Sequence, residues 1–152
     1  MANTQSMCTS FMGELLVGTH NFTATTGDTF KAALYLTTAT LNASTTAYSA
    51  TGEVSGTGYS AGGVAVTNGS SPTATNSSST AGVAYWTPSA SITYTTVTLS
   101  TAFDTMLLYN SSKSNKAVAV YTFGSQTVTA GTFSLTMPSN TTSTALLRLD
   151  TA

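Results

Sequence analysis

The sequence has 152 residues, of which 41% are hydrophobic and only 6% are charged, and its formal net charge is −1. We expect a chain of this length to form one domain and to bury about 70% of its unfolded surface. Soluble domains typically carry about 25% charged residues, and here Ser and Thr, about a third of the chain, replace them. The four basic residues are scattered, which argues against a nucleic-acid-binding surface. They are Lys31, Lys113, Lys116 and Arg148.

Several absences narrow the class of protein further. The first residues, MANTQSMCTSF, lack the basic and apolar regions of a secretory signal, and no run reaches the about 18–20 apolar residues of a membrane span. The only cysteine, Cys8, excludes an internal disulfide. Seven Tyr, six Phe and abundant Thr and Val favour β structure. We therefore expect an N-terminal arm over residues 1–10 and a single β-sandwich domain over residues 11–152.

One short helix is predicted near the N-terminus. Residues 8–18, CTSFMGELLVG, carry an apolar stripe of Phe11, Leu15 and Leu16 and end in Gly18, a residue typical of helix C-termini. The stripe has two interpretations. It packs on the domain's own core, or it contacts a neighbouring subunit.

Short strands are predicted in the first half of the chain. Residues 29–37 alternate, with Phe30 and Leu34 on one face and Tyr35 on the other, which indicates a strand. Residues 64–66 predict another. Between these strands, residues 44–48 suggest a helical turn.

A loop is predicted after these strands. Residues 68–81, NGSSPTATNSSSTA, have no large side chain, which favours an exposed loop. Residues 82–88, which follow this loop, include the only tryptophan, Trp86.

The second half of the chain carries the clearest local pattern. Two apolar runs, residues 106–110 and 116–123, are separated by five residues, 111–115, which predicts a hairpin. Upstream, Tyr94 and Val97 lie on opposite parities, so a strand there needs a bulge or a change of sheet. Other strands are predicted at 126–129, at 132–137, where Pro138 ends the strand, and at 145–150 as an edge strand. The pattern indicates a mainly β, antiparallel two-sheet sandwich, jelly-roll-like, of about eight short strands with one N-terminal helix.

The segment GEVSGTGYSAGG, residues 52–63, has five glycines in twelve residues. Such a density permits unusual backbone angles and close approach of two chains, so we expect a compact backbone crossing. Tyr59 would fix the crossing to the core, and Glu53 would bind backbone donors or a neighbouring base. The residues of this structural motif are Gly52, Glu53, Gly56, Gly58, Tyr59, Gly62 and Gly63.

The sequence contains few residues in patterns typical of catalytic or metal-binding sites. His20 has no evident partners for a metal site, which usually needs three or four ligands, and no G-x-S-x-G motif is present. Asp28, Glu53 and Asp104 lack the spacing of a calcium loop. Asp28 and Asp104 as a glycosidase carboxylate pair would be coincidental. We predict a protein that is not an enzyme, with no catalytic residue, metal or cofactor.

Two aromatic residues allow a binding hypothesis. Tyr85 and Trp86, beside the Ser/Thr-rich loop, could stack on a carbohydrate. Ordinary strand packing favours the alternative, in which one lies in the core and the other pairs across strands.

The two segments DTFKAALYLTTATLNASTTAYSATGEVSGTGYSAGG (28–63) and NSSKSNKAVAVYTFGSQTVTAGTFSLTMP (110–138) resemble a family of small virion structural proteins of tailed bacteriophages. The resemblance begins near Phe11 and runs almost to Arg148. It lies in the order of the motifs: helix, DTFK strand, glycine segment and Asn-Lys-Ala-Val hairpin strand. Residues 68–81 are the part least like the family.

The resemblance implies a coat component without catalytic residues. Its implied role is capsid decoration (cement): a homo-oligomer, dimer or trimer, made in the host cytoplasm and bound to the major capsid protein on the capsid surface, with no nucleic-acid or membrane partner. The alternative is a tail- or fibre-associated protein acting as a host-surface adhesin. For the cement role, we expect residues 2–10 and the helix stripe (Phe11, Leu15, Leu16) to contribute to subunit contacts.

Overall fold

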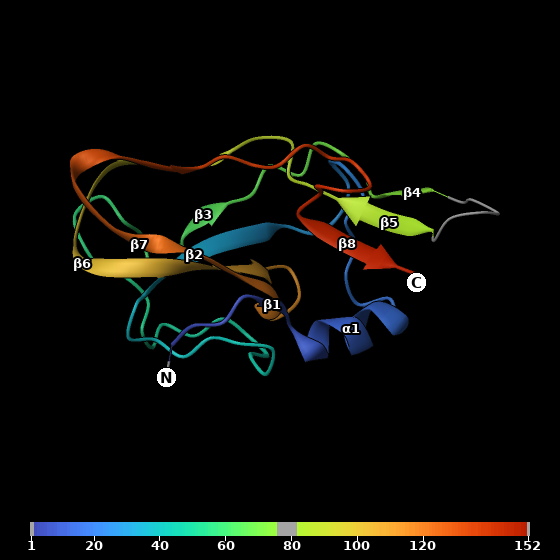
Figure 1. Cartoon of the computed structure of the whole chain (residues 1–152), viewed down its shortest axis with the longest axis horizontal. Helices are drawn as coiled ribbons and strands as arrows, with labels where there is room; N and C mark the ends of the chain where they lie inside the picture. The colour runs from blue at the N-terminus through green and yellow to red at the C-terminus, as the bar shows by residue number, and fades with distance from the viewer. Residues whose placement is uncertain (1, 76–81, 152) are drawn as a thin grey trace.

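The computed structural model describes residues 2–75 and 82–151. Within them the chain is mainly β, with one short helix and two antiparallel sheets (Figure 1). The larger sheet has the strand order β1-β7-β6-β2-β3, and the smaller one has the order β4-β5-β8. The elements are β1 (Ser6–Met7), α1 (Thr9–Leu16), β2 (Phe30–Leu36), β3 (Val64–Ala65), β4 (Thr73–Thr75), β5 (Val83–Trp86), β6 (Ile92–Asn110), β7 (Lys116–Leu135) and β8 (Leu147–Asp150).

This architecture confirms the expected antiparallel two-sheet fold, but two strands are much longer than expected. β6 has 19 residues and β7 has 20. They form one hairpin across the predicted turn, with Asn110 opposite Lys116. Ser114 and Asn115 in this turn have positive φ angles of 53° and 58°, which asparagine tolerates better than most residues. The predicted segments 106–110, 116–123 and 126–129 lie inside this hairpin, as does the stretch with Tyr94 and Val97. The strand predicted from residue 132 lies in it only as far as Leu135, where β7 ends.

The parity change predicted in β6 is a break in strand pairing. The register between β6 and β7 shifts between Tyr94 and Val97, and Thr96 has a φ of 53°. A residue inserted in this way bends a strand and exchanges its faces. Val97 is therefore buried although its parity differs from that of Tyr94, which is buried too.

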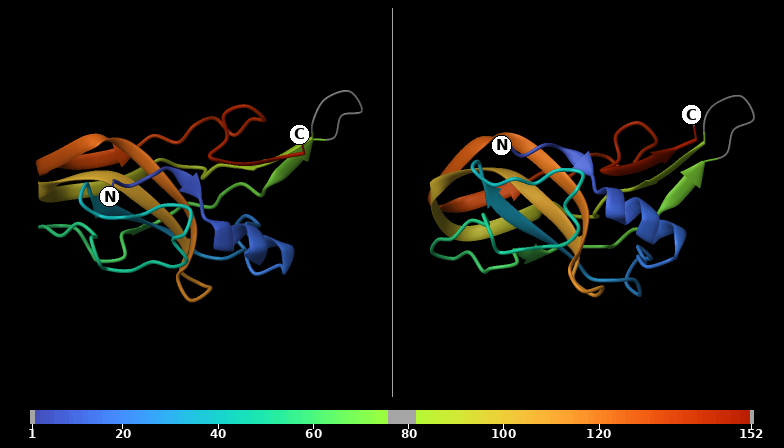
Figure 2. Two further views of the ribbon diagram at one scale, coloured as in Figure 1. Left: turned by 60° about the horizontal axis from the view of Figure 1, so that its bottom comes forward. Right: turned by 90° about the horizontal axis from the view of Figure 1, so that it is seen from below.

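The β6–β7 hairpin folds back over itself and produces a two-layered body (Figure 1, Figure 2). A further register shift between Leu99 and Phe103 lies at the bend. Aromatic contacts then join the two halves, because the Phe103 and Phe133 rings pack edge to face with centroids 5.0 Å apart. The Tyr94 hydroxyl donates a 2.7 Å hydrogen bond to the Ala32 carbonyl of β2 in the other layer.

β2 is buried on both sides. It lies between β6 and β3, and Phe30 and Leu34 on one face and Tyr35 on the other are all at most 2% exposed. Fully covered strands of this kind are the centre of a sheet, where the burial of apolar area stabilises the fold most.

The N-terminal segment is tied to the body. Ser6 and Met7 form β1, which pairs with β7 at the edge of the larger sheet. The Asn3 amide donates a 2.8 Å hydrogen bond to the Asp104 carboxylate, and Cys8 is completely buried. The expected boundary at residue 10 is therefore not visible as a separation between an arm and a domain.

The remaining predictions differ in their outcome. The helix is confirmed as α1, and Gly18 after it has a φ of 69°. The edge strand predicted at 145–150 is confirmed as β8, and residues 82–88 contain β5. Residues 44–48 form no helix; instead Ala47 makes an isolated bridge with Lys116.

The predicted loop at 68–81 is wrong in part. It contains β4, which pairs with β5, so part of the stretch is a strand. Its residues 76–81 lie outside the described residues.

Candidate functional site

The glycine-rich segment 52–63 runs along the edge of β2 and reaches the other layer. The Val54 N–H donates a 3.0 Å hydrogen bond to the Leu34 carbonyl of β2. Three residues later, Thr57 forms a bridge with Thr98 in the first half of β6. The segment therefore connects the two layers, as the sequence predicted for a compact crossing.

Two of its glycines allow a very close backbone approach. Gly63 has a φ of 67°, and a Cβ atom there would overlap the Ala32 carbonyl oxygen of β2. Gly58 has a φ of 79°, and a Cβ there would overlap the Thr96 carbonyl of β6. Only glycine adopts these angles without strain and leaves the space that the neighbouring strands occupy.

Glu53 is the polar centre of the crossing. Its Oε2 accepts a hydrogen bond from the Tyr48 hydroxyl at 2.6 Å, and its Oε1 accepts from the Tyr59 hydroxyl at 2.7 Å and the Gly62 N–H at 2.8 Å. The Tyr59 oxygen in turn accepts the Leu34 N–H of β2 at 3.0 Å. The expectations that Glu53 binds a backbone donor and that Tyr59 fixes the segment to the core are both confirmed.

The tyrosines around Glu53 remain protonated donors at neutral pH. Burial, together with the hydrogen bond to the Glu53 carboxylate, raises the pKa of Tyr48 to about 12. Burial likewise raises the pKa of Tyr59 and Tyr94. The rings stack in pairs, Tyr48 with Tyr109 and Tyr59 with Tyr94, with centroids 4.9 and 5.7 Å apart. This cluster holds the two layers together.

A second polar network joins α1 to the β6–β7 turn. His20, whose side chain is fully buried, lies 2.7 Å from Glu14 through Nε2. The Asn110 amide nitrogen lies 3.0 Å from His20 Nδ1 and 2.8 Å from Asp28 Oδ2. Because an amide nitrogen only donates, Nδ1 accepts, and His20 carries its hydrogen on Nε2 and donates it to Glu14.

Both carboxylates of this network are held in the ionised form. Burial alone would raise the pKa of Glu14, but hydrogen bonds from Lys116 and His20 outweigh it and hold the pKa below the ordinary value of 4.5. Burial of Asp28 is similarly outweighed by the Asn21 N–H and neighbouring side-chain donors, so its pKa lies below 3.8. Such shifts make stability depend on pH.

We expect the free energy of unfolding to decrease as the pH falls below about 5. Glu14 and Asp28 have lower pKa values in the folded state, so their contribution is present above the unfolded-state values and is lost as the pH falls through the folded-state values. Urea unfolding at a series of pH values measures this. The double variant Glu14→Gln/Asp28→Asn should show a shallower dependence than the wild type, and equal slopes would contradict the assignment.

The carboxylates considered for catalysis or calcium do not come together. Asp28 lies in the His20 network, Glu53 lies beneath the tyrosines, and Asp104 accepts a hydrogen bond from Asn3. In the part of the chain that the structure describes, no three His, Cys, Asp or Glu side chains are placed to hold a metal ion. Cys8 behaves as a small apolar residue, since burial raises the pKa of its thiol to about 11.

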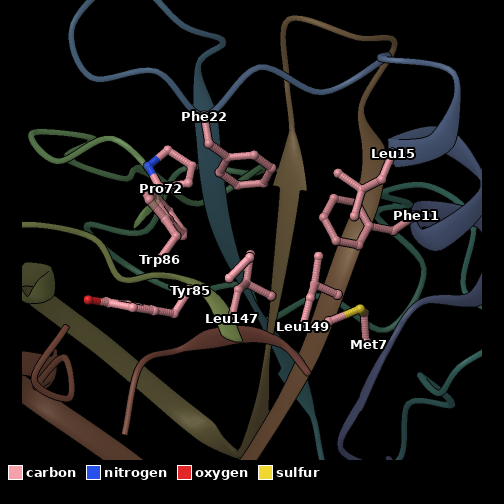
Figure 3. Close-up of a pocket in the computed structure, with 10 residues that line it drawn as sticks. Met7, Phe11, Leu15, Phe22, Pro72, Tyr85, Trp86, Leu147 and Leu149 are labelled. Carbon is pink, nitrogen blue, oxygen red and sulfur yellow. The ribbon is translucent and has the colours of Figure 1, made fainter. Parts of the chain in front are cut away.

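An apolar pocket of about 130 Å³ opens between α1, β5 and β8 (Figure 3). Phe11 and Leu15 project into it from α1, and Leu147 and Leu149 project into it from β8. Phe22, from the loop after α1, closes another side. A pocket with this lining suits an apolar side chain rather than a charged ligand.

Exposed apolar side chains lie on the elements that bound this pocket. Leu16 is 90% exposed, Val17 is 77% exposed, and Met12 and Leu149 are each more than 40% exposed. The first three belong to α1 or directly follow it, and Leu149 lines the pocket itself. We call these four residues the α1–β8 surface. Met12 and Leu16 are four residues apart and therefore share one face of α1, and contiguous exposed apolar patches commonly mark interaction sites.

The predicted helix stripe is divided between these roles. Phe11 is 2% exposed and packs on His20, with ring centroids 4.9 Å apart, so it belongs to the chain's own core. Leu15 lines the pocket, and Leu16 points into solvent. Of the three, Leu16 is the residue most available for a subunit contact.

The predicted aromatic pair follows the core interpretation. Trp86 is 2% exposed, packs edge to face on Phe22 with centroids 4.9 Å apart, and donates from Nε1 to Asn68 and Ser70. Its ring is therefore not an exposed stacking platform. Tyr85 directs its hydroxyl away from the pocket (Figure 3).

Comparison of the chain with protein-family models, curated proteins and solved structures returned no match. The one helix among the described residues, α1, is too short to cross a membrane.

Sequence reasoning also missed the pocket, although the alternating Leu147 and Leu149 were a usable sign of a one-sided strand.

Proposed function

We propose that this chain is a non-enzymatic virion structural protein of a tailed bacteriophage, a capsid decoration (cement) protein that binds and stabilises the shell of the major capsid protein. The observation that carries the proposal is the α1–β8 surface beside the apolar pocket. A shell-binding protein needs such a contact surface and no reaction centre. The resemblance of the glycine segment and the hairpin to small phage structural proteins supports the same role.

The physical basis of this role is burial of apolar area at many equivalent positions. Covering a side chain such as Leu16 contributes about 1.5–3 kcal/mol, which gives modest affinity per copy. A ligand that binds only the assembled shell shifts its stability by mass action. With 6% charged residues in the chain, we expect the contact to depend only weakly on salt.

The Leu16→Asp variant should lower the affinity for the shell at least about tenfold, because it places a charge where an apolar contact is needed. Leu16 is 90% exposed, so the variant should fold normally. Binding to shells assembled without this protein, followed by quantification of bound copies, measures the effect.

The matched control is Gln126→Asp, an exposed position on β7. It should bind at wild-type occupancy. Wild-type occupancy of Leu16→Asp would overturn the assignment of the surface, and absence of the wild-type protein from purified virions would overturn the proposed function.

The alternative role is that of a tail- or fibre-associated host-surface adhesin. The position of the protein on the virion distinguishes this role from capsid decoration. Labelled protein spread over the heads of virions in electron micrographs supports decoration. Label at the tail, with binding of the purified protein to host cells, supports the alternative.

A further inference from the structure

We propose that β8 pairs edge to edge with β8 of a second copy of this chain, antiparallel and with a two-fold axis at Leu149. β8 is the outer strand of the three-stranded sheet, as Figure 1 shows. The two small sheets would then form one continuous sheet across the dimer. This inference concerns self-association and does not depend on the proposed role in a capsid.

The backbone of β8 presents suitable groups at its outer edge. The Thr151 N–H donates a 3.0 Å hydrogen bond to the Gly82 carbonyl, a pair that continues the register of β5 and β8. Alternate residues of an antiparallel strand bond to the same neighbour. Leu149 therefore also bonds towards β5, whereas Arg148 and Asp150 direct their N–H and C=O groups outward.

These outward groups match those of a second copy in one register. When Leu149 lies opposite its own copy, Arg148 of each chain lies opposite Asp150 of the other, and both pairs exchange backbone hydrogen bonds. An axis at Arg148 or at Asp150 would keep the hydrogen-bond phase but place two like charges opposite each other, which is destabilising. An axis between residues would misalign the outward groups. The charges therefore select Leu149 as the centre.

The charge pattern identifies the partner as a second copy. Arg148 and Asp150 lie on the same face of β8, where they form an ion pair at 3.1 Å, and both are partly exposed. Arg-Leu-Asp is antisymmetric in charge about its centre, so it is complementary to itself when reversed. A partner with a different sequence would not require that symmetry, whereas a two-fold dimer does, because each contact occurs twice.

The other face of the strand contributes an apolar contact. Leu149 is 43% exposed and lines the pocket of Figure 3. Side chains in a non-hydrogen-bonded pair lie especially close, so the two Leu149 side chains would cover each other. Stable interfaces bury about 1,200–2,000 Å², more than a four-residue strand supplies, so we expect a weak dimer.

Charge-reversal variants test the pairing. Arg148→Asp makes the edge wholly acidic, and Asp150→Arg makes it wholly basic. Each variant alone should raise the dimer dissociation constant at least about tenfold, because like charges then face each other twice. An equimolar mixture of the two should form a heterodimer. Sedimentation velocity at high protein concentration measures association, and native mass spectrometry identifies the heterodimer by its mass.

The double variant Arg148→Asp/Asp150→Arg is the control. It keeps the antisymmetric pattern and should dimerise like the wild type, which also keeps the test decisive if a single variant folds poorly. A role confined to the ion pair within one chain predicts no association on mixing. A wild type that stays monomeric, or single variants that dimerise like it, would overturn the proposal.

Discussion

The Gly63→Ala variant should lose about 3 kcal/mol or more of its free energy of unfolding. A Cβ at this position would overlap the Ala32 carbonyl, and the φ of 67° is itself unfavourable for alanine. β2 cannot move away easily, because it is held on both sides by β6 and β3. Equilibrium urea denaturation, followed by tryptophan fluorescence or circular dichroism, measures the loss.

The matched control is Gly13→Ala in α1. A Cβ there meets no atom within 4 Å, and alanine is favoured over glycine in a helix by about 0.5–1 kcal/mol. The same chemical change should therefore stabilise the protein slightly. Wild-type stability of Gly63→Ala would contradict the close approach of the glycine segment to β2.

The Asn110→Leu variant should be destabilised by about 3 kcal/mol. The Asn110 side chain donates to both His20 and Asp28, and the residue is fully buried. Leucine has a similar size but no donor, so the buried ring nitrogen of His20 loses its hydrogen bond. The partly buried Asp28 carboxylate loses one of its donors. Thermal and urea unfolding measure the loss of stability.

Two further measurements make this prediction specific. Asn140→Leu, at an exposed position, should change stability by no more than about 0.5 kcal/mol. Nitrogen NMR should find the His20 hydrogen on Nε2 in the wild type and a less uniform tautomer in Asn110→Leu. A single tautomer with Nδ1 protonated in the wild type would refute the network as described.

Local patterns in the sequence predicted much of the fold. The run from 106 to 123 contains both arms of a hairpin and a turn with Asn115, and pairing between near neighbours depends mainly on such local signals. The parity change between Tyr94 and Val97 correctly indicated a break in pairing. The α1 helix and β2 followed from apolar periodicity.

Features that depend on distant contacts could not be predicted in this way. β4 lies in a stretch of small polar residues, and it is a strand because β5 supplies its hydrogen bonds. The bend of the β6–β7 hairpin depends on aromatic packing such as that of Phe103 on Phe133. Burial of both faces of β2 likewise depends on layers formed elsewhere in the chain.

The candidate site shows the same division. The glycine density and Glu53 predicted a compact backbone crossing, because glycine permits positive φ angles and close backbone approach whatever residues surround it. His20 and Asn110 are 90 residues apart, and nothing in the sequence pairs them. The assignment of Phe11 and Leu16 to different environments depends on the angle at which α1 meets the sheets.

The short connection between β6 and β7 determines the order in which we expect parts of the chain to fold. Asn110 and Lys116 pair across a five-residue turn. Once this turn has formed, each further pair of β6 and β7 residues adds to an existing hairpin. The entropic cost of loop closure per pair is therefore small. β1 and β8, in contrast, find their partner strands far along the chain. We expect folding to begin in the central hairpin and to finish at both ends.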